Sequence, residues 1–217
     1  MADPVVEITW LGHSCFKIKG KEVTLVTDPY NGSIGYSPAK LEADIITLSH
    51  HHPGHSYVAG IEGNPKVLQG PGEYEVSEVF VTGISTFHDS SEGKSHGKNT
   101  IYLIEMDEVR LCHLGDLGHV LLPHQVEELG TVQVLFIPVG GVSTIDARIA
   151  AEIVRLLNPK LVLPMHYQTE VVAWLDPVDK FLKEMGLRGV APQPKVSLTR
   201  SHLPSETQVA VLDYRYY

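Results

Sequence analysis

A hydrophobic run leads directly into a cluster of histidines in the stretch DIITLSHHHPGH, residues 44–55. Its β-branched residues predict a strand, and Pro53-Gly54 predicts a turn just after it. Alternate residues of an extended segment point the same way, so His50 and His52 can bind one ion while His55 turns toward another. The stretch therefore predicts a metal site at the carboxyl end of a strand.

Four other hydrophobic runs also end in a side chain that can bind metal. They are VTLVTD ending at Asp28, FVTGISTFH at His88, VRLCHLGD at Asp116 and KLVLPMH at His166. Open α/β sheets bind ligands at the carboxyl ends of their strands, so these groups are expected to converge on one pocket. A lone histidine is more often a hydrogen-bonded core residue, and a triple histidine can form a surface loop. Recurrence at five strand ends favours a metal centre instead.

The order of these groups resembles the metallo-β-lactamase superfamily, whose signature is H-x-H-x-D-H followed by a downstream His, a Gly-Asp and a final His. The matching segments are Thr27-Asp28-Pro29, Ser49 to His55, His88-Asp89, Gly115-Asp116 and Pro164-Met165-His166-Tyr167. The segments Thr9 to Ser14 and Ile137 to Gly141 resemble the small branch that includes ascorbate-6-phosphate lactonases. The resemblance covers nearly the whole chain and implies an α/β fold: an αββα sandwich of two packed mixed β-sheets with helices on the outer faces.

The resemblance also implies a set of metal ligands. The residues that match are His50, His52 and His88 for a first position, and His55, Asp116 and His166 for a second, with Asp116 bridging the two. Three nitrogen ligands and an open coordination position are typical of a catalytic zinc. The expected cofactor is one or two divalent ions, zinc first, with manganese or iron as alternatives.

One position departs from the signature. Gly54 stands where the superfamily places the aspartate of H-x-H-x-D-H, so the second position lacks a carboxylate. We therefore expect the second ion to bind more weakly, with a metal content nearer one ion per chain than two. Asp89, which follows a predicted ligand, is the first candidate to replace the missing carboxylate.

Three further residues are predicted to support the site. Asp28 is expected to hold the unligated nitrogen of a histidine ligand, although it can equally cap the turn before Pro29. His13, in a Gly-His-Ser turn, is expected to contact substrate or to be structural, and His119 is expected to donate a proton to a leaving group.

These residues together predict a metal-dependent hydrolase. A bound metal lowers the pKa of its water toward 7, which makes hydroxide available to attack a small ester, lactone or phosphodiester-like substrate. The alternative is a regulatory or non-catalytic metal-binding domain that lost hydrolysis with the change at Gly54. Di-iron redox chemistry is disfavoured, because the superfamily branch that performs it uses a glutamate where His52 stands. The substrate cannot be named, because specificity depends on loops.

Composition narrows the class of protein. The chain has 217 residues, 43% hydrophobic and 20% charged, which suits one globular domain over residues 1–217. A formal net charge of −9 without a cluster of Lys and Arg argues against a nucleic-acid partner. A small-molecule substrate is the expected partner.

Location and assembly are also predicted. Cys15 and Cys112 lie in hydrophobic runs and do not suggest a disulfide framework. No signal peptide or run of about 20 apolar residues is found, so we expect a cytoplasmic protein with no membrane association. The aromatic stretch 214–217 predicts a homo-oligomer interface away from the pocket.

The hydrophobic pattern predicts strands first and alternating strands and helices later. Strands are expected at 5–10, 15–19, 23–27, 76–87, 99–114, 132–139, 160–164 and 207–212, and helices at 145–157 and 177–185. Ser143 or Thr144 is expected to cap the first helix, and Asn158-Pro159 to end it. Polar segments 31–40 and 89–98 are expected to be loops near the pocket.

Overall fold

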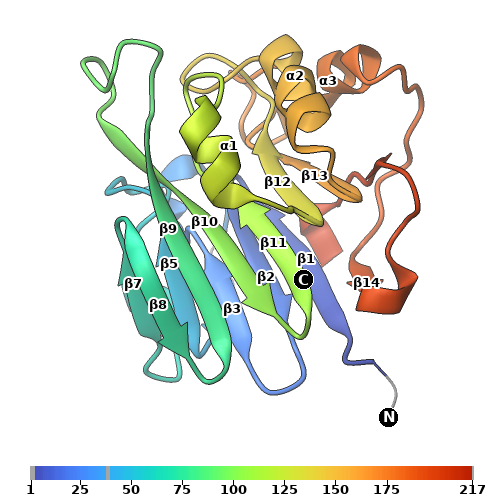
Figure 1. The fold of residues 1–217 in the computed structure, drawn as a ribbon. Coiled ribbons are helices and arrows are strands. Elements are labelled where there is room, and N and C mark those ends of the chain that lie inside the picture. The colour runs from blue at the N-terminus through green and yellow to red at the C-terminus, as the bar shows by residue number, and fades with distance from the viewer. Residues whose placement is uncertain (1–2, 38–39, 217) are drawn as a thin grey trace.

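Two packed β-sheets form the body of the protein in the computed structural model, which describes residues 3–37 and 40–216 (Figure 1). The six-stranded sheet has the order β14-β1-β2-β3-β5-β7. Its strands are β14 (Val196–Leu198), β1 (Val6–Gly12), β2 (Cys15–Lys19), β3 (Thr24–Thr27), β5 (Ile45–Leu48) and β7 (Lys66–Gln69). The first four strands in this order run antiparallel, whereas β3, β5 and β7 run parallel.

The second sheet has seven strands in the order β15-β13-β12-β11-β10-β9-β8. Its strands are β15 (Gln208–Val209), β13 (Leu161–Met165), β12 (Val134–Pro138), β11 (Val109–His113), β10 (Lys98–Met106), β9 (Val79–Phe87) and β8 (Gly72–Val76). The strands from β8 to β11 are antiparallel, and β11, β12, β13 and β15 are parallel. Both sheets are therefore mixed.

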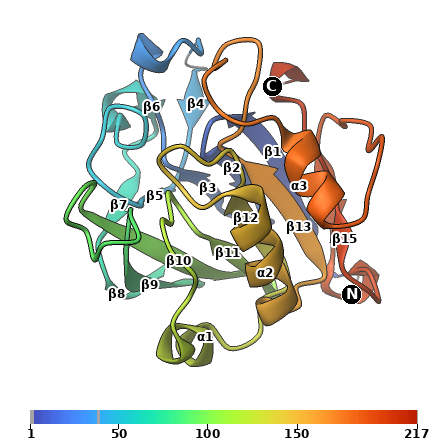
Figure 2. The ribbon, with the colours of Figure 1, turned by 90° about the horizontal axis from the view of Figure 1, so that it is seen from above.

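The α-helices accompany the seven-stranded sheet. They are α1 (Pro123–Leu129), α2 (Ala147–Leu157) and α3 (Val178–Glu184), and α2 packs against both α3 and β12. Figure 2 shows α1 and α2 on the outer side of this sheet, while the short strands β4 (Leu41–Glu42) and β6 (Ile61–Glu62) lie on the opposite side of the molecule. The described residues also contain four 3-10 helices: η1 (Gly32–Ile34), η2 (Val58–Gly60), η3 (Arg200–His202) and η4 (Tyr214–Tyr216).

The core between the sheets is apolar and continuous. Trp10 and Phe16 of the first sheet and Tyr102 and Phe136 of the second are almost completely buried, and Phe16 packs on Phe136 with ring centroids 4.6 Å apart. This burial is the main stabilising contribution, because each buried aromatic side chain removes a large apolar area from water.

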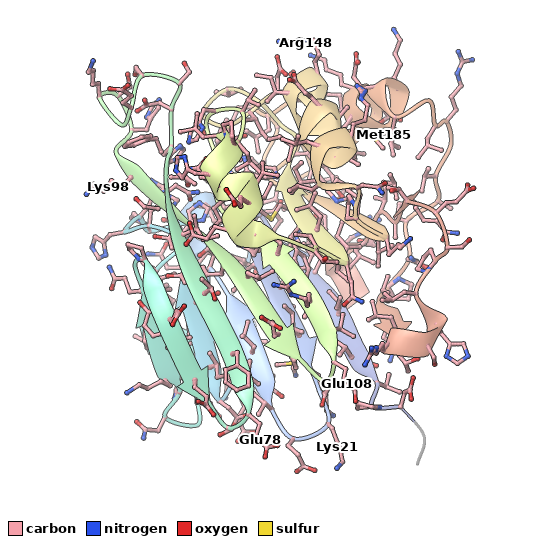
Figure 3. All side chains as sticks on the ribbon, viewed as in Figure 1. Lys21, Glu78, Lys98, Glu108, Arg148 and Met185 are labelled. Atoms are coloured by element: carbon pink, nitrogen blue, oxygen red, sulfur yellow. The ribbon has the colours of Figure 1, made fainter. Side chains whose placement is uncertain are left out.

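The strands place the predicted site at one end of the sandwich. Figure 3 shows Lys21, Glu78 and Glu108 in turns at one end, and Lys98 and Arg148 toward the other. Strands β1, β3, β5, β9, β11 and β13 all run toward the end away from the Glu78 and Glu108 turns. The side chains that follow these strands therefore meet at one edge.

The predicted fold of two packed mixed sheets is confirmed, and several element boundaries differ from prediction. The expected strands 76–87 and 99–114 are each interrupted by a two-residue turn, at Ser77-Glu78 and at Asp107-Glu108. All four turn residues have positive φ, as a type I′ hairpin turn requires, but without the glycine that usually marks one.

The helices also differ in part from the prediction. Asp146, rather than Ser143 or Thr144, caps α2 through a 2.9 Å hydrogen bond from the Ile149 amide. The helix ends as predicted, because Asn158 adopts the left-handed conformation at its C-cap. Helix α1, which begins at Pro123, was not predicted, and positions 38–39 of the expected loop 31–40 lie outside the described residues. Within residues 3–37 and 40–216, no helix is long and apolar enough to cross a bilayer.

Candidate metal centre

Asp116 is the centre of a buried histidine cluster. Its Oδ2 lies 3.1 Å from Nε2 of His55, 3.3 Å from Nε2 of His88 and 3.4 Å from Nε2 of His166. Asp116 follows β11, His88 follows β9 and His166 follows β13, while His55 lies in the turn beyond β5. The sheet edge thus brings together four side chains that are far apart in the sequence.

The turn before Asp116 needs a glycine. Gly115 has a φ of 56°, and a Cβ there would lie 2.4 Å from Oδ1 of Asn99 and 2.5 Å from Cβ of Ser49. The same Asn99 Oδ1 accepts a 3.0 Å hydrogen bond from the Asp116 amide. Asn99, which the sequence did not suggest, therefore fixes the backbone that carries the central carboxylate.

A second carboxylate, Asp28, supports the cluster from behind. Its Oδ2 accepts hydrogen bonds from the Ser49 hydroxyl at 2.6 Å and from Nδ1 of His55 at 3.0 Å, and its Oδ1 accepts from the Ser49 amide at 2.7 Å. The Ser49 hydroxyl lies 3.0 Å from Nδ1 of His50. Because that hydroxyl already donates to Asp28, it accepts from His50 Nδ1. Nδ1 of both His50 and His55 is therefore occupied by a hydrogen-bond partner, which leaves Nε2 as the nitrogen that can bind metal.

Burial and charge set the ionisation of the cluster. Burial lowers the pKa of His50 to about 4 and also lowers the pKa of His166. At His55 burial acts in the same direction, but the charge and hydrogen bonds of Asp116 and Asp28 outweigh it and raise the pKa to about 10. Although burial alone would raise the pKa of Asp116, the surrounding histidines hold it well below its usual range. Asp116 is thus an ionised carboxylate.

The first predicted position is grouped around His50. His50 has a ligand atom within 4.8 Å of those of His88 and Asp116, and a ligand atom within the same distance of those of His52 and His55. The predicted set His50, His52 and His88 does not form one such group, because His52 lies at the exposed rim and groups with His50 and His55. The structure therefore groups Asp116, the predicted bridging residue, with His50 and His88, and it separates His52 from His88.

The donor geometry fits a divalent metal ion. Adjacent donor atoms around a tetrahedral zinc with bonds of about 2.0–2.1 Å lie about 3.3 Å apart. The three Asp116–histidine distances of 3.1, 3.3 and 3.4 Å bracket that value. The donors are imidazole nitrogens and a carboxylate oxygen, which zinc prefers.

His13 also belongs to the cluster. It lies between β1 and β2, is 5% exposed, and has a donor atom within 4.8 Å of those of His55, Asp116 and His166. Its ring centroid is 4.3 Å from that of His166 and 4.8 Å from that of His55. The structure therefore places the residue predicted to contact substrate among the groups that could hold a metal.

Asp89 has partners elsewhere. Its carboxylate accepts hydrogen bonds of 2.7–2.9 Å from the Ser91 hydroxyl and from the amides of Ser91, Gly93, Ser95 and His96. These bonds organise the loop after β9. The carboxylate that was expected to replace the one missing at position 54 is used to hold this loop.

The ring of His119 is also engaged by the backbone. Its Nδ1 donates to the carbonyl of Val120 at 2.8 Å, and its Nε2 accepts from the Phe87 amide at 3.2 Å. Neither nitrogen is left to donate a proton to a leaving group in this arrangement. The predicted role of His119 as a proton donor is therefore not supported by the structure.

Two features at the rim were not predicted. Trp174 is 59% exposed and stands edge to face against His166, with ring centroids 6.3 Å apart. The exposed ring of His96 lies 5.3 Å from that of His88. Trp174 carries no ligand motif, so only its tertiary position reveals it.

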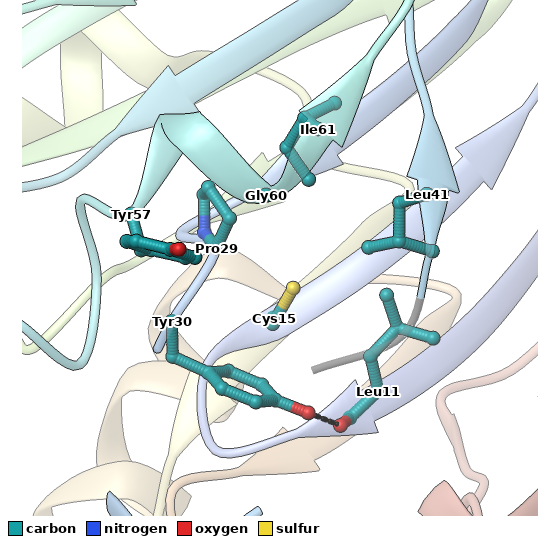
Figure 4. A pocket seen from close by; sticks show the side chains of 8 residues that line it. All are labelled: Leu11, Cys15, Pro29, Tyr30, Leu41, Tyr57, Gly60 and Ile61. Carbon is teal, nitrogen blue, oxygen red and sulfur yellow. Dashed lines mark hydrogen bonds between the residues drawn. The ribbon is translucent and has the colours of Figure 1, made fainter. Parts of the chain in front are cut away.

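An apolar pocket lies behind the turn that carries His13. Figure 4 shows its lining, which includes Leu11, Cys15, Pro29 and Tyr30, and the hydrogen bond from the Tyr30 hydroxyl to the Leu11 carbonyl. None of the eight lining residues belongs to the histidine–aspartate cluster. The candidate site therefore does not lie in this pocket.

Comparison with known proteins agrees with this geometry. The family model described as a beta-lactamase superfamily domain matches residues 7–166. The chain belongs to the beta-lactamase superfamily. A UPF0173 metal-dependent hydrolase of Thermococcus onnurineus is 32% identical over 212 residues, covering 84% of this chain and 93% of the relative. A UPF0173 metal-dependent hydrolase of Pyrococcus furiosus is 30% identical with the same coverage.

A solved structure is similar over almost the full length. It is a candidate Zn-dependent hydrolase of the metallo-beta-lactamase superfamily from Thermotoga maritima, with a TM-score of 0.81, 39% identity, and coverage of 95% of this chain and 98% of that one. The chain is therefore grouped with the metal-dependent hydrolases of this superfamily.

Proposed function

We propose that the protein hydrolyses a small ester, lactone or phosphodiester-like substrate with one or two zinc ions held by the histidine–aspartate cluster. The observation that supports this most directly is the convergence of three imidazole Nε2 atoms on one Asp116 oxygen at 3.1–3.4 Å. A bound divalent ion supplies an activated water near neutral pH and polarises a carbonyl or phosphoryl oxygen.

The residues of the chain prepare this chemistry. Asp28 and Ser49 hold His50 and His55 through Nδ1, which orients each Nε2 before a metal binds. Asp116 brings negative charge to the middle of the imidazoles, which favours a cation there. His50, His88 and Asp116 surround the first position, and His52, which groups with His50, lies at the exposed rim where substrate approaches from solvent.

Zinc is the preferred metal of the proposal. The cluster offers mainly imidazole nitrogens, whereas magnesium and manganese favour carboxylate and water oxygens. The relatives' names specify a metal without naming zinc, and the similar Thermotoga maritima structure is described as Zn-dependent.

We also propose that the protein is cytoplasmic and associates with a second copy of itself. Cys15 and Cys112 are free and buried, which suits a reducing compartment such as the cytoplasm. The only partner that we propose besides the substrate is a second copy of the chain. Tyr214, the first residue of the predicted interface stretch, packs within its own chain against Trp10 and Tyr36, and Tyr217 lies outside the described residues.

A substrate panel tests the proposed function. Zinc-loaded protein is assayed with nitrophenyl esters, aliphatic lactones and a nitrophenyl phosphodiester, beside Asp116→Asn and the exposed control Asp179→Asn. We expect turnover of at least one class, nearly complete loss with Asp116→Asn and no change with Asp179→Asn. Stoichiometric zinc binding without turnover of any class would instead support a regulatory metal-binding domain.

A further inference from the structure

Gly54 and His13 occupy the same space beside the second metal position. A Cβ built on Gly54 would lie 3.3 Å from Nε2 of His13 and 3.2 Å from Nδ1 of His52. A side chain at position 54 would therefore extend toward the imidazole of His13. The glycine leaves that space open, and the His13 ring uses it.

The backbone holds His13 firmly in this place. Its φ of 53° lies in the left-handed region, which costs free energy for a residue with a side chain. The His13 carbonyl accepts hydrogen bonds from Nε1 of Trp10 at 3.0 Å and from the His166 amide at 3.1 Å. The next residue, Ser14, donates from its hydroxyl to Oδ1 of Asp116 at 3.2 Å. The turn is thus tied directly to two members of the cluster.

Burial of this imidazole needs a compensating interaction. His13 is 5% exposed, and its Nδ1 has no hydrogen-bond partner among the described residues. An unpaired buried polar atom is unfavourable, so a strained and buried histidine is not explained by packing alone. A metal bond to the ring would provide that compensation, because four donors, one each from His13, His55, Asp116 and His166, lie within 4.8 Å of one another.

We propose that His13 is a ligand of the second metal position, where its imidazole replaces the carboxylate that an aspartate at position 54 would supply. The inference rests on the proposed metal centre and assigns His13, His55, His166 and Asp116 to its second ion. Three nitrogens and one carboxylate form a complete tetrahedral set, so the second position is filled by zinc rather than left weak. The lost carboxylate also makes this position poor for magnesium and manganese.

The test compares metal content across a compensating pair of variants. Protein stripped with a chelator is dialysed against zinc or cobalt, and bound metal per chain is measured by mass spectrometry with the cobalt absorption spectrum. We expect two ions in the wild type, one in His13→Ala and His13→Gln, and two again in His13→Ala combined with Gly54→Asp. Gly54 does not have a positive φ, and removing the His13 ring makes room for the new carboxylate. His124→Ala, on an exposed histidine of α1, should bind two ions.

The outcomes separate this inference from the proposed function. A wild type that binds no metal would overturn the metal centre itself. Two ions with unchanged affinity in both His13 variants, or a single ion in the saturated wild type, would overturn only the role of His13. Native circular dichroism of each variant checks folding. If His13→Ala does not fold, His13→Gln and the double variant still decide, because restored binding requires the carboxylate at position 54.

Discussion

The Nδ1 atom of His55 lies 3.0 Å from Oδ2 of Asp28, and on the other side of the ring Nε2 lies 3.1 Å from Oδ2 of Asp116. His55 is therefore held between two carboxylates of different purpose. Asp28 hydrogen-bonds the far nitrogen of the ring, and Asp116 belongs to the metal-binding cluster. The same Asp28 oxygen also binds the hydroxyl of Ser49, which reaches His50. One buried carboxylate thus orients a histidine at each of the two proposed metal positions.

Asp28→Asn should weaken metal binding without removing a ligand. Asparagine keeps the shape and tolerates the φ of 40° at this position, but it loses the charge that orients His55. Loss of such a partner typically costs about 10–100-fold in metal affinity. A competition titration of zinc against a chromogenic chelator measures this, with Asp179→Asn as the matched control. Unchanged zinc affinity would mean that Asp28 serves only to cap the turn.

Removing two ligands of the first position should remove its ion. His50 and His88 both belong to the group around Asp116, so His50→Ala combined with His88→Ala leaves Asp116 without a nitrogen partner on that side. We expect the metal content to fall by about one ion per chain and hydrolysis to be nearly abolished. Elemental analysis decides the point, and a double variant with the metal content of the wild type would remove these residues from the site. His124→Ala and His202→Ala, both exposed, form the matched control.

The loop that Asp89 organises should loosen in acid. Hydrogen bonds from the amide of His96 and from neighbouring loop groups hold the pKa of the Asp89 carboxyl below its usual range. Such a depressed pKa means that the ionised form stabilises the loop above the ordinary carboxyl pKa of about 3.9, and that this contribution is lost as the pH falls below it. Asp89→Asn should reproduce the acid effect at neutral pH.

Hydrogen exchange measures the change at single amides. We expect faster exchange at Ser91, Gly93, Ser95 and His96 in Asp89→Asn, with the strand amides of β9 and β10 unchanged. Metal content should stay the same, because the Asp89 carboxylate is bound to the loop. A loss of metal in this variant would revive the earlier expectation that Asp89 supplies a ligand.

Both cysteines should be unreactive in the native protein. Burial raises the pKa of the Cys15 and Cys112 thiols, and the thiolate is the reactive form. A thiol reagent at pH 8 should therefore modify neither residue until the protein is unfolded in denaturant, whereas Ser201→Cys, at an exposed site, should react at once. Rapid modification of native Cys15 would show that the apolar pocket of Figure 4 opens in solution.

The sequence predicted where the site lies better than it predicted the turns and contacts around it. Each of the five hydrophobic runs ends in its histidine or aspartate at the same edge of the sandwich. The order of the motifs was enough to predict this, because the carboxyl ends of strands that run in the same direction lie at one edge. The hairpin turn at Asp107-Glu108 was missed because two acidic residues there adopt the positive φ that glycine normally signals. Helix α1 is short and carries no clear apolar period, so local pattern did not reveal it.

Contacts between distant residues could not be predicted. Asp89 and His119 are close in sequence to ligands, yet both are engaged by neighbouring backbone. His13 and Gly54 are separated by 41 positions, and only the fold shows that the ring of one fills the space left by the other. Ligand identity followed from residue type and order, whereas this substitution within the cluster depends on tertiary packing.

Trp174→Ala should separate substrate binding from metal binding. The ring is 59% exposed and stands edge to face against His166, so it forms an apolar wall beside the proposed second metal position. Its removal should change the free energy of unfolding by no more than about 0.5 kcal/mol, because it is a surface substitution, and should leave the zinc content unchanged. For a substrate that contacts this wall, we expect a several-fold higher KM for aromatic esters and little change for aliphatic ones.

Steady-state kinetics with matched phenyl and methyl esters measure the difference, and Val5→Ala, at an exposed apolar residue of the N-terminal segment, is the control. Equal effects on both esters would place the substrate away from Trp174, and a loss of zinc would show that the ring instead holds His166 in position.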